Sequence, residues 1–173
     1  MKFSPFITQL QNCINEKHLL SHPFYQMWKK GTLPLFAMQQ YAQQYYHLET
    51  AFPTFLSRLH ADCPVFEVRQ AITDNLYDEE HGQQNHRELW FRFGETIGSE
   101  REAMEHSTML PGTVETIDTF RKLASSSFLE GIAALAAYES QIPAVAESKL
   151  QGLKEHYNIT DTNETAFFRV HAQ

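Results

Sequence analysis

The chain has 173 residues, of which 42% are hydrophobic and 20% are charged, the balance of a globular protein and not of a disordered one. This length fits one domain, so a single domain over residues 1–173 is expected. The formal net charge of -7 disfavours nucleic acid or an anionic membrane as partner, because both attract a basic surface. Only 7 Gly and 7 Pro are present, which favours an all-α fold over many short strands.

The cysteines and the apolar segments indicate where the protein works. Cys13 and Cys63 are isolated, so neither a zinc site nor a disulfide framework is expected. The longest apolar run, around residues 131–137, is too short to span a bilayer. We therefore expect a protein of the reducing cytoplasm.

Three helices are predicted in the first part of the chain. Ser4-Pro5 has the form of a helix cap followed by proline in the first turn, and Pro23 repeats this arrangement. Gly31 is suited to ending the second helix, and Pro53 is expected to kink the third. The predicted ranges are about 5–20, 23–31 and 34–60.

Four further helices are predicted after Asp62. Between Pro64 and Gly94 only Gly82 could break a helix, so this stretch is expected to be one helix. Ser99 and Glu102 match a capping box that would open a short helix. The next predicted helix covers residues 113 to about 156 and is bent or broken near Pro143. The last one follows a cap formed by Asp161 and Glu164.

Three polar side chains, Asn75, Glu79 and His86, interrupt the apolar face of the predicted helix 64–94. Glu79 and His86 are seven residues apart, so on one helix they would emerge about 20° apart and could reach one point. A buried carboxylate requires a cation, a metal ion or a hydrogen-bond network. The pair could therefore share a metal, form a hydrogen-bonded core pair, or lie on a solvated face. The apolar positions of the same face are Val68, Ile72 and Phe93, and the polar Asn75 lies among them.

Two more polar residues stand among apolar positions. Glu139 lies in the middle of an apolar stripe of the helix 113–156, and His171 follows Phe167 and Phe168 by one turn. His171 taken alone is compatible with a structural role. Two carboxylates and two imidazoles suit iron or manganese, because zinc more often has thiolates or three histidines. A ferritin-like bundle is disfavoured, since no histidine has a glutamate three residues before it.

Three stretches of the sequence have the form of motifs of a known family. They are His22-Pro23-Phe24-Tyr25, residues 75–82 followed by His86, and residues 138–143 followed by Lys149. In this order and spacing they resemble the heme-oxygenase-like diiron oxidases, in particular the Chlamydia protein associating with death domains and its relatives. The resemblance covers nearly the whole chain. It implies an all-α heme-oxygenase-like bundle of about seven helices, the last one truncated, related in fold to TenA and PqqC.

The resemblance also implies a ligand set for two metal ions. Glu79, His86, Glu139 and His171 match four of the family's six ligand positions. The other two, an aspartate and a histidine four and seven residues after His171, would lie beyond Gln173. The chain as given is therefore expected to be truncated, with an incomplete site for an iron pair or an iron and manganese pair.

The activity that the resemblance implies is synthesis of para-aminobenzoate for folate, with O₂ and a reductant consumed by a homodimeric enzyme. Tyr25 matches the tyrosine that supplies the ring, and Lys149 matches the donor of the amino group. Tyr41 and Tyr138 match aromatic neighbours of the metals. From the residues alone, Tyr25 could instead pack against Trp28, and Lys149 could be an ordinary surface lysine.

Two other functions remain open at this point. One is a metal-free oxidase similar to PqqC, or a thiamin-related enzyme similar to TenA. The TenA type uses an active-site cysteine, and neither Cys13 nor Cys63 lies in the corresponding region. The other is a non-enzymatic module whose acidic surface binds a basic protein.

Overall fold

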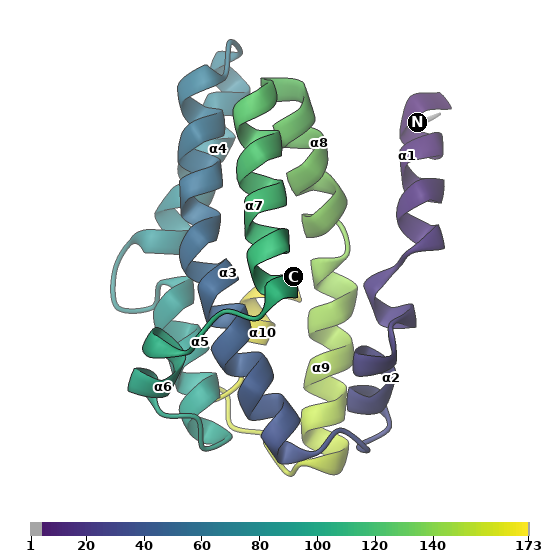
Figure 1. The fold of residues 1–173 in the computed structure, drawn as a ribbon, viewed down its shortest axis with the longest axis vertical. Helices are drawn as coiled ribbons and strands as arrows, with labels where there is room; N and C mark the ends of the chain where they lie inside the picture. The colour runs from purple at the N-terminus through teal and green to yellow at the C-terminus, as the bar shows by residue number, and fades with distance from the viewer. Residues whose placement is uncertain (1–4, 173) are drawn as a thin grey trace.

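The computed structural model describes residues 5–172, and within this range the chain forms helices and no strand (Figure 1). This confirms the predicted all-α class. Ten α-helices stand where seven were predicted, because two of the predicted long helices are divided. The elements are α1 (Pro5–Glu16), η1 (Leu19–Ser21), α2 (Pro23–Lys29), α3 (Leu35–Asp62), α4 (Phe66–Glu80), α5 (His86–Thr96), α6 (Arg101–His106), α7 (Pro111–Ser126), α8 (Phe128–Glu139), α9 (Ile142–His156) and α10 (Ala166–His171).

The long helix α3 is the axis of the fold. It contacts α4, α7 and α8 in the upper half of the molecule, and α5 and α6 in the lower half (Figure 1). Buried apolar side chains form two clusters along it. The lower one contains Trp28, Met38, Tyr46, Trp90, Phe93, Phe167 and Phe168, and the upper one Phe52, Phe55, Leu59, Ile72, Ile117 and Leu135. The stretch of α3 between Tyr46 and Phe52 therefore lies between the two clusters, in a region that we call the waist.

The helix starts and stops in the first part of the chain follow the sequence signals. His22 caps α2, its Nδ1 accepting a hydrogen bond from the Phe24 N–H at 3.2 Å. Gly31 follows this helix with φ of 67°, a left-handed conformation that favours glycine. The first helix is shorter than predicted, since α1 ends at Glu16 and a 3-10 turn follows. Ser4 lies outside the described residues.

The prediction of one helix over residues 64–94 was wrong. The chain leaves the helix after Glu80 and starts α5 at His86. Gly82 adopts φ of 77°, a conformation that ends helices. The Asn85 side chain then caps α5 by accepting the Glu88 N–H at 2.9 Å, which favours a new helix start over continuation.

The predicted helix 113–156 is divided twice. The break near Pro143 was predicted, and Pro143 lies in the first turn of α9. The break at Ser127 was not predicted. Ser127 has an extended backbone, and its hydroxyl accepts a hydrogen bond from the Glu130 N–H at 3.2 Å, so a local cap outweighs the apolar periodicity of the flanking residues.

The expected capping box before α6 does not form. The helix begins at Arg101, with Glu100 in the cap position, and the buried Ser99 hydroxyl makes no hydrogen bond to any described residue. Pro111 lies in the first turn of α7. Among the described residues, no helix combines the length and the apolar character that crossing a membrane would require.

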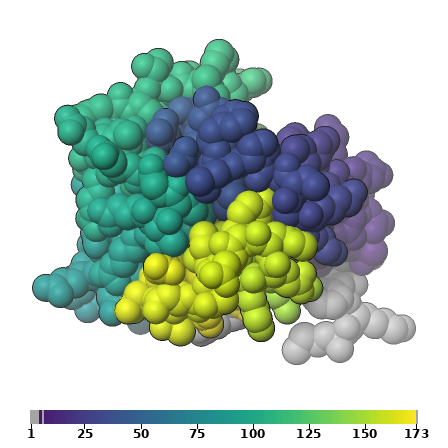
Figure 2. Space-filling model, turned by 90° about the horizontal axis from the view of Figure 1, so that it is seen from below, coloured from purple at the N-terminus to yellow at the C-terminus, as the bar shows by residue number. Residues whose placement is uncertain are grey.

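At the lower end of the molecule the start of α3 lies between α2 and α9 on one side and α5 and α6 on the other (Figure 2). The close packing of α2 on α9 depends on Gly152, because a Cβ there would lie 2.7 Å from Trp28 Cδ1 and 3.0 Å from its carbonyl oxygen. A Gly152→Ala variant should lose about 1–3 kcal/mol of unfolding free energy, measured by urea denaturation. The matched Gly112→Ala variant should lose none, since its Cβ would meet nothing within 4 Å.

Candidate metal centre

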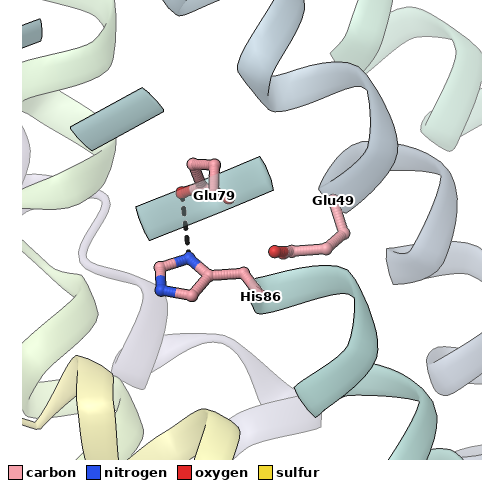
Figure 3. A group of neighbouring side chains, drawn as sticks. All are labelled: Glu49, Glu79 and His86. Carbon is pink, nitrogen blue, oxygen red and sulfur yellow. Dashed lines mark ion pairs between the residues drawn. The ribbon is translucent and has the colours of Figure 1, made fainter. Parts of the chain in front are cut away.

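Three ionisable side chains meet at the waist between the two apolar clusters (Figure 3). Glu49 comes from the middle of α3, Glu79 from the last turn of α4, and His86 is the first residue of α5. Potential ligand atoms of the three all lie within 4.8 Å of one another. The break between α4 and α5 thus does not separate Glu79 from His86 but folds one back toward the other.

The contacts within this group are incomplete as hydrogen bonds. His86 Nδ1 lies 3.0 Å from Glu79 Oε1, which is close enough for a hydrogen bond. This buried nitrogen nevertheless makes no hydrogen bond to the described residues, because the direction of approach is unsuitable for one. Glu49 and Glu79 are only 6% and 7% exposed. The reading of Glu79 as part of a solvated face was wrong. Two buried carboxylates and an unsatisfied imidazole nitrogen at one point are costly without a shared cation.

Glu139 and His171 line the same cavity as this group. Its volume is about 400 Å³, and all four predicted metal ligands border it together with Glu49. The rings of His86 and His171 have centroids 4.5 Å apart. His171 Nδ1 donates a hydrogen bond to the Phe167 carbonyl at 2.7 Å, an arrangement that leaves Nε2 with a free lone pair. The structure therefore brings together all four residues that the sequence singled out.

The electrostatics of the group favour a bound cation. Burial, and then the neighbouring Glu79, raise the pKa of Glu49 well above its usual range. Burial also raises the pKa of Glu139. The pKa of His171 falls to about 4 because of burial and the nearby His86, so its imidazole is neutral at neutral pH and able to ligate a metal. A divalent cation would replace the proton that the carboxylates otherwise need.

A second group of predicted residues lies beside the first. Tyr25, Tyr41, Tyr138 and Lys149 border a small cavity of about 20 Å³ whose wall also includes His171. Lys149 is 5% exposed, so its reading as a surface lysine was wrong. Its Nζ lies 2.5 Å from the Tyr41 hydroxyl and 5.3 Å from the centre of the Tyr25 ring.

Comparison with known proteins assigns the family. Residues 39–173 match the model of a family described as iron-containing redox enzymes. The chain is 40% identical to a 4-aminobenzoate synthase of Chlamydia muridarum over 97% of its own length and 72% of that protein. It is 37% identical to a 4-aminobenzoate synthase of Nitrosomonas europaea, covering 99% and 74%. The chain belongs to the iron-containing redox enzymes. It is also 26% identical to a pyrroloquinoline-quinone synthase of Acinetobacter baumannii, over 86% of the chain and 60% of that protein.

The side chains at the waist fit the iron that these redox enzymes contain. Carboxylate and imidazole donors suit iron, whereas thiolates would point to zinc. No cysteine borders the cavity. The unsatisfied Nδ1 of His86 and the crowded carboxylates Glu49 and Glu79 each need a positive charge. These carboxylates and imidazoles would hold the iron, which would supply the redox chemistry.

Two residues of the site were missed in the sequence. Glu49 carries the same signal as Glu79 and Glu139, a single carboxylate within an apolar stripe. That stripe of α3 comprises Met38, Ala42, Tyr46, Phe52, Pro53 and Leu56. Tyr45 borders both cavities, and its hydroxyl lies 3.0 Å from that of Tyr138. A tyrosine in a helix rich in aromatic residues carries no signal that distinguishes it from core.

The buried Lys149 amine makes stability depend on pH. Burial lowers its pKa from 10.5 to about 7, so between these values the unfolded chain holds a proton that the folded chain does not. Stability from this group therefore rises with pH, by at most about 1.4 kcal/mol per unit. A Lys149→Met variant should be more stable than the natural chain near pH 7, and the difference should shrink toward pH 9.5. Urea unfolding of both proteins at several pH values measures this; a constant difference would contradict a neutral Lys149.

Proposed function

We propose that the protein is a 4-aminobenzoate synthase that takes the ring from its own Tyr25 and the nitrogen from Lys149. One observation carries this proposal. A phenol ring and an amine are enclosed together beside the candidate metal centre, around a cavity of only about 20 Å³, too small for an external aromatic substrate. The names of the Chlamydia and Nitrosomonas relatives support the same product.

The proposed ligands of an iron pair, or of an iron and manganese pair, are Glu79, His86, Glu139 and His171, with Glu49 in addition. Glu79 is the central residue, because it lies within reach of both His86 and Glu49. Bound at this point, the metal pair would supply the oxidising power of O₂ for attack on a phenol, with electrons from an external reductant. No organic cofactor is needed for such chemistry.

The residues around Lys149 prepare it to act as a nucleophile. Its pKa of about 7 leaves a large neutral fraction at neutral pH, and a neutral amine has the lone pair that attack requires. The amine donates a hydrogen bond to the Tyr41 hydroxyl oxygen at 2.5 Å, which leaves its lone pair free. Because burial raises the pKa of Tyr41 well above its usual range, that phenol keeps its proton and offers no negative charge that would hold the amine in its ammonium form.

The aromatic side chains around the amine exclude water. Lys149 Nζ lies between 4.5 and 5.7 Å from the centres of five aromatic rings. Tyr138 and Tyr45 close the side toward the metal ligands, and burial raises the pKa of both phenols. Reactive species formed between the ring of Tyr25 and the amine would thus be shielded from solvent.

Growth of a bacterial strain that lacks its own para-aminobenzoate genes tests the proposed function. The strain should grow without added para-aminobenzoate when it expresses the full-length coding sequence and is supplied with iron. Failure to grow, with iron-loaded protein present in the cells, would contradict the proposal. Purified protein that oxidises an added small quinone precursor instead would favour an activity like that of the Acinetobacter relative.

A further inference from the structure

A second cavity also borders the candidate metal centre. Its volume is about 450 Å³. It shares Glu49 and Glu79 with the cavity described above. Further residues of α3 and α4 line it, and α5 and α6 form the side that α8 to α10 form in the first cavity. All its lining residues lie between positions 49 and 105.

The wall of this second cavity has more negative than positive charge. Five glutamates and two arginines line it. Arg101 is paired with Glu88, its Nη1 2.7 Å from Glu88 Oε2, and Arg87 is paired with Glu105 at 3.1 Å. Each arginine is thus already neutralised by a carboxylate, which leaves an anion no free positive charge to bind.

Three of the carboxylates that line the second cavity have no arginine or lysine partner among residues 5–172. They lead from solvent toward the inner end of this cavity. Glu80 is exposed, while Glu79 and Glu49 at the inner end are 7% and 6% exposed. The Glu49 carboxylate points toward Glu79 and His86 in Figure 3. Carboxyl groups without a lysine or arginine partner therefore lead from solvent to the buried ligand atoms.

We propose that this second cavity is the entrance by which a divalent cation reaches Glu49, Glu79 and His86, and that Glu80 is the first carboxylate it meets. The proposal rests on the metal centre of the proposed function. A cleft lined by one sign of charge concentrates counter-ions and raises their association rate, an effect that salt weakens. Arg87, on the same wall, offsets the charge of Glu105, so removing Arg87 would leave one more carboxylate to attract the cation.

Binding of Co²⁺ to the purified metal-free protein, followed by its visible absorption in a stopped-flow instrument, tests the entrance. Glu80→Gln should slow association about threefold or more at low salt, and Arg87→Gln should accelerate it. Both should leave the final amount of bound Co²⁺ unchanged. Glu115→Gln, an exposed change on α7 outside both cavities, should bind at the natural rate. In about 0.5 M salt the rates should converge.

A substitution in the first cavity distinguishes the two possible routes by which the metal ion could enter. Val170 borders only the first cavity and is 44% exposed, so Val170→Phe should narrow it without unfolding the protein and should leave the rate unchanged. Slow binding by Val170→Phe, or natural rates for both Glu80→Gln and Arg87→Gln, would overturn the entrance while leaving the metal centre intact. Absence of Co²⁺ binding by the natural chain would overturn both.

Discussion

A Tyr25→Phe variant should make no para-aminobenzoate. Phenylalanine lacks the hydroxyl at which one-electron oxidation of the ring would begin, so the proposed ring source is lost. The fold should survive, because the Tyr25 hydroxyl makes no hydrogen bond to the residues that the structure describes and its ring packs edge-on against Phe24 at 5.3 Å. Mass spectrometry of the supernatant after incubation with iron, O₂ and a reductant measures the product.

Tyr46→Phe is the matched control for this variant. Tyr46 is also buried, but it packs on Phe91 and borders neither of the cavities beside Lys149. It should yield as much product as the natural chain. Product from Tyr25→Phe at the level of Tyr46→Phe would show that the ring comes from elsewhere.

A Glu79→Gln variant should lose bound iron almost completely. The Glu79 carboxylate lies 3.0 Å from His86 Nδ1 and within 4.8 Å of a Glu49 oxygen, and a neutral amide in its place would be a weaker ligand that could not balance the charge of the metal. Loss of residues that merely orient ligands lowers metal affinity about 10–100-fold, so loss of a central ligand should exceed this. Elemental analysis after anaerobic loading with Fe²⁺ measures it. Asp78→Asn, an exposed neighbour, should keep its iron.

Glu79→Gln should stabilise the fold of the metal-free protein, although it removes iron from the loaded protein. Burial and Glu79 raise the pKa of Glu49 above 4.5 in the folded state, so the folded chain binds more protons than the unfolded chain above this pH. Metal-free protein therefore loses stability as pH rises from about 4.5. Glu79→Gln removes part of the repulsion and should flatten this dependence. A metal-free variant that is less stable than the natural chain at pH 7 would argue that the carboxylates are not in conflict.

The sequence predicted that Glu79 and His86 would meet, but the reason was partly wrong. Glu79 and His86 were expected to approach each other because they lie two turns apart on one helix. In the structure a turn containing Gly82 separates two helices, and the pair still meets. A glycine and a local asparagine cap at Asn85 decide this break, and neither is visible in an apolar periodicity.

The positions of the candidate ligands follow from the helix breaks. Glu79 lies in the last turn of α4, His86 starts α5, Glu139 ends α8 and His171 ends α10. These ends gather at the waist between the apolar clusters, a tertiary arrangement that no single helix face reveals. Glu49 alone lies within a helix, and its stripe could have been read in advance.

Isotope labelling tests the central claim most directly. Protein carrying tyrosine with a fully ¹³C-labelled ring is incubated with iron, O₂ and a reductant in unlabelled buffer, and the product is analysed by mass spectrometry. The account predicts para-aminobenzoate with a fully labelled ring, at no more than one molecule per chain, and a corresponding loss of mass at Tyr25. Unlabelled product, or repeated turnover with Tyr25 intact, would contradict it.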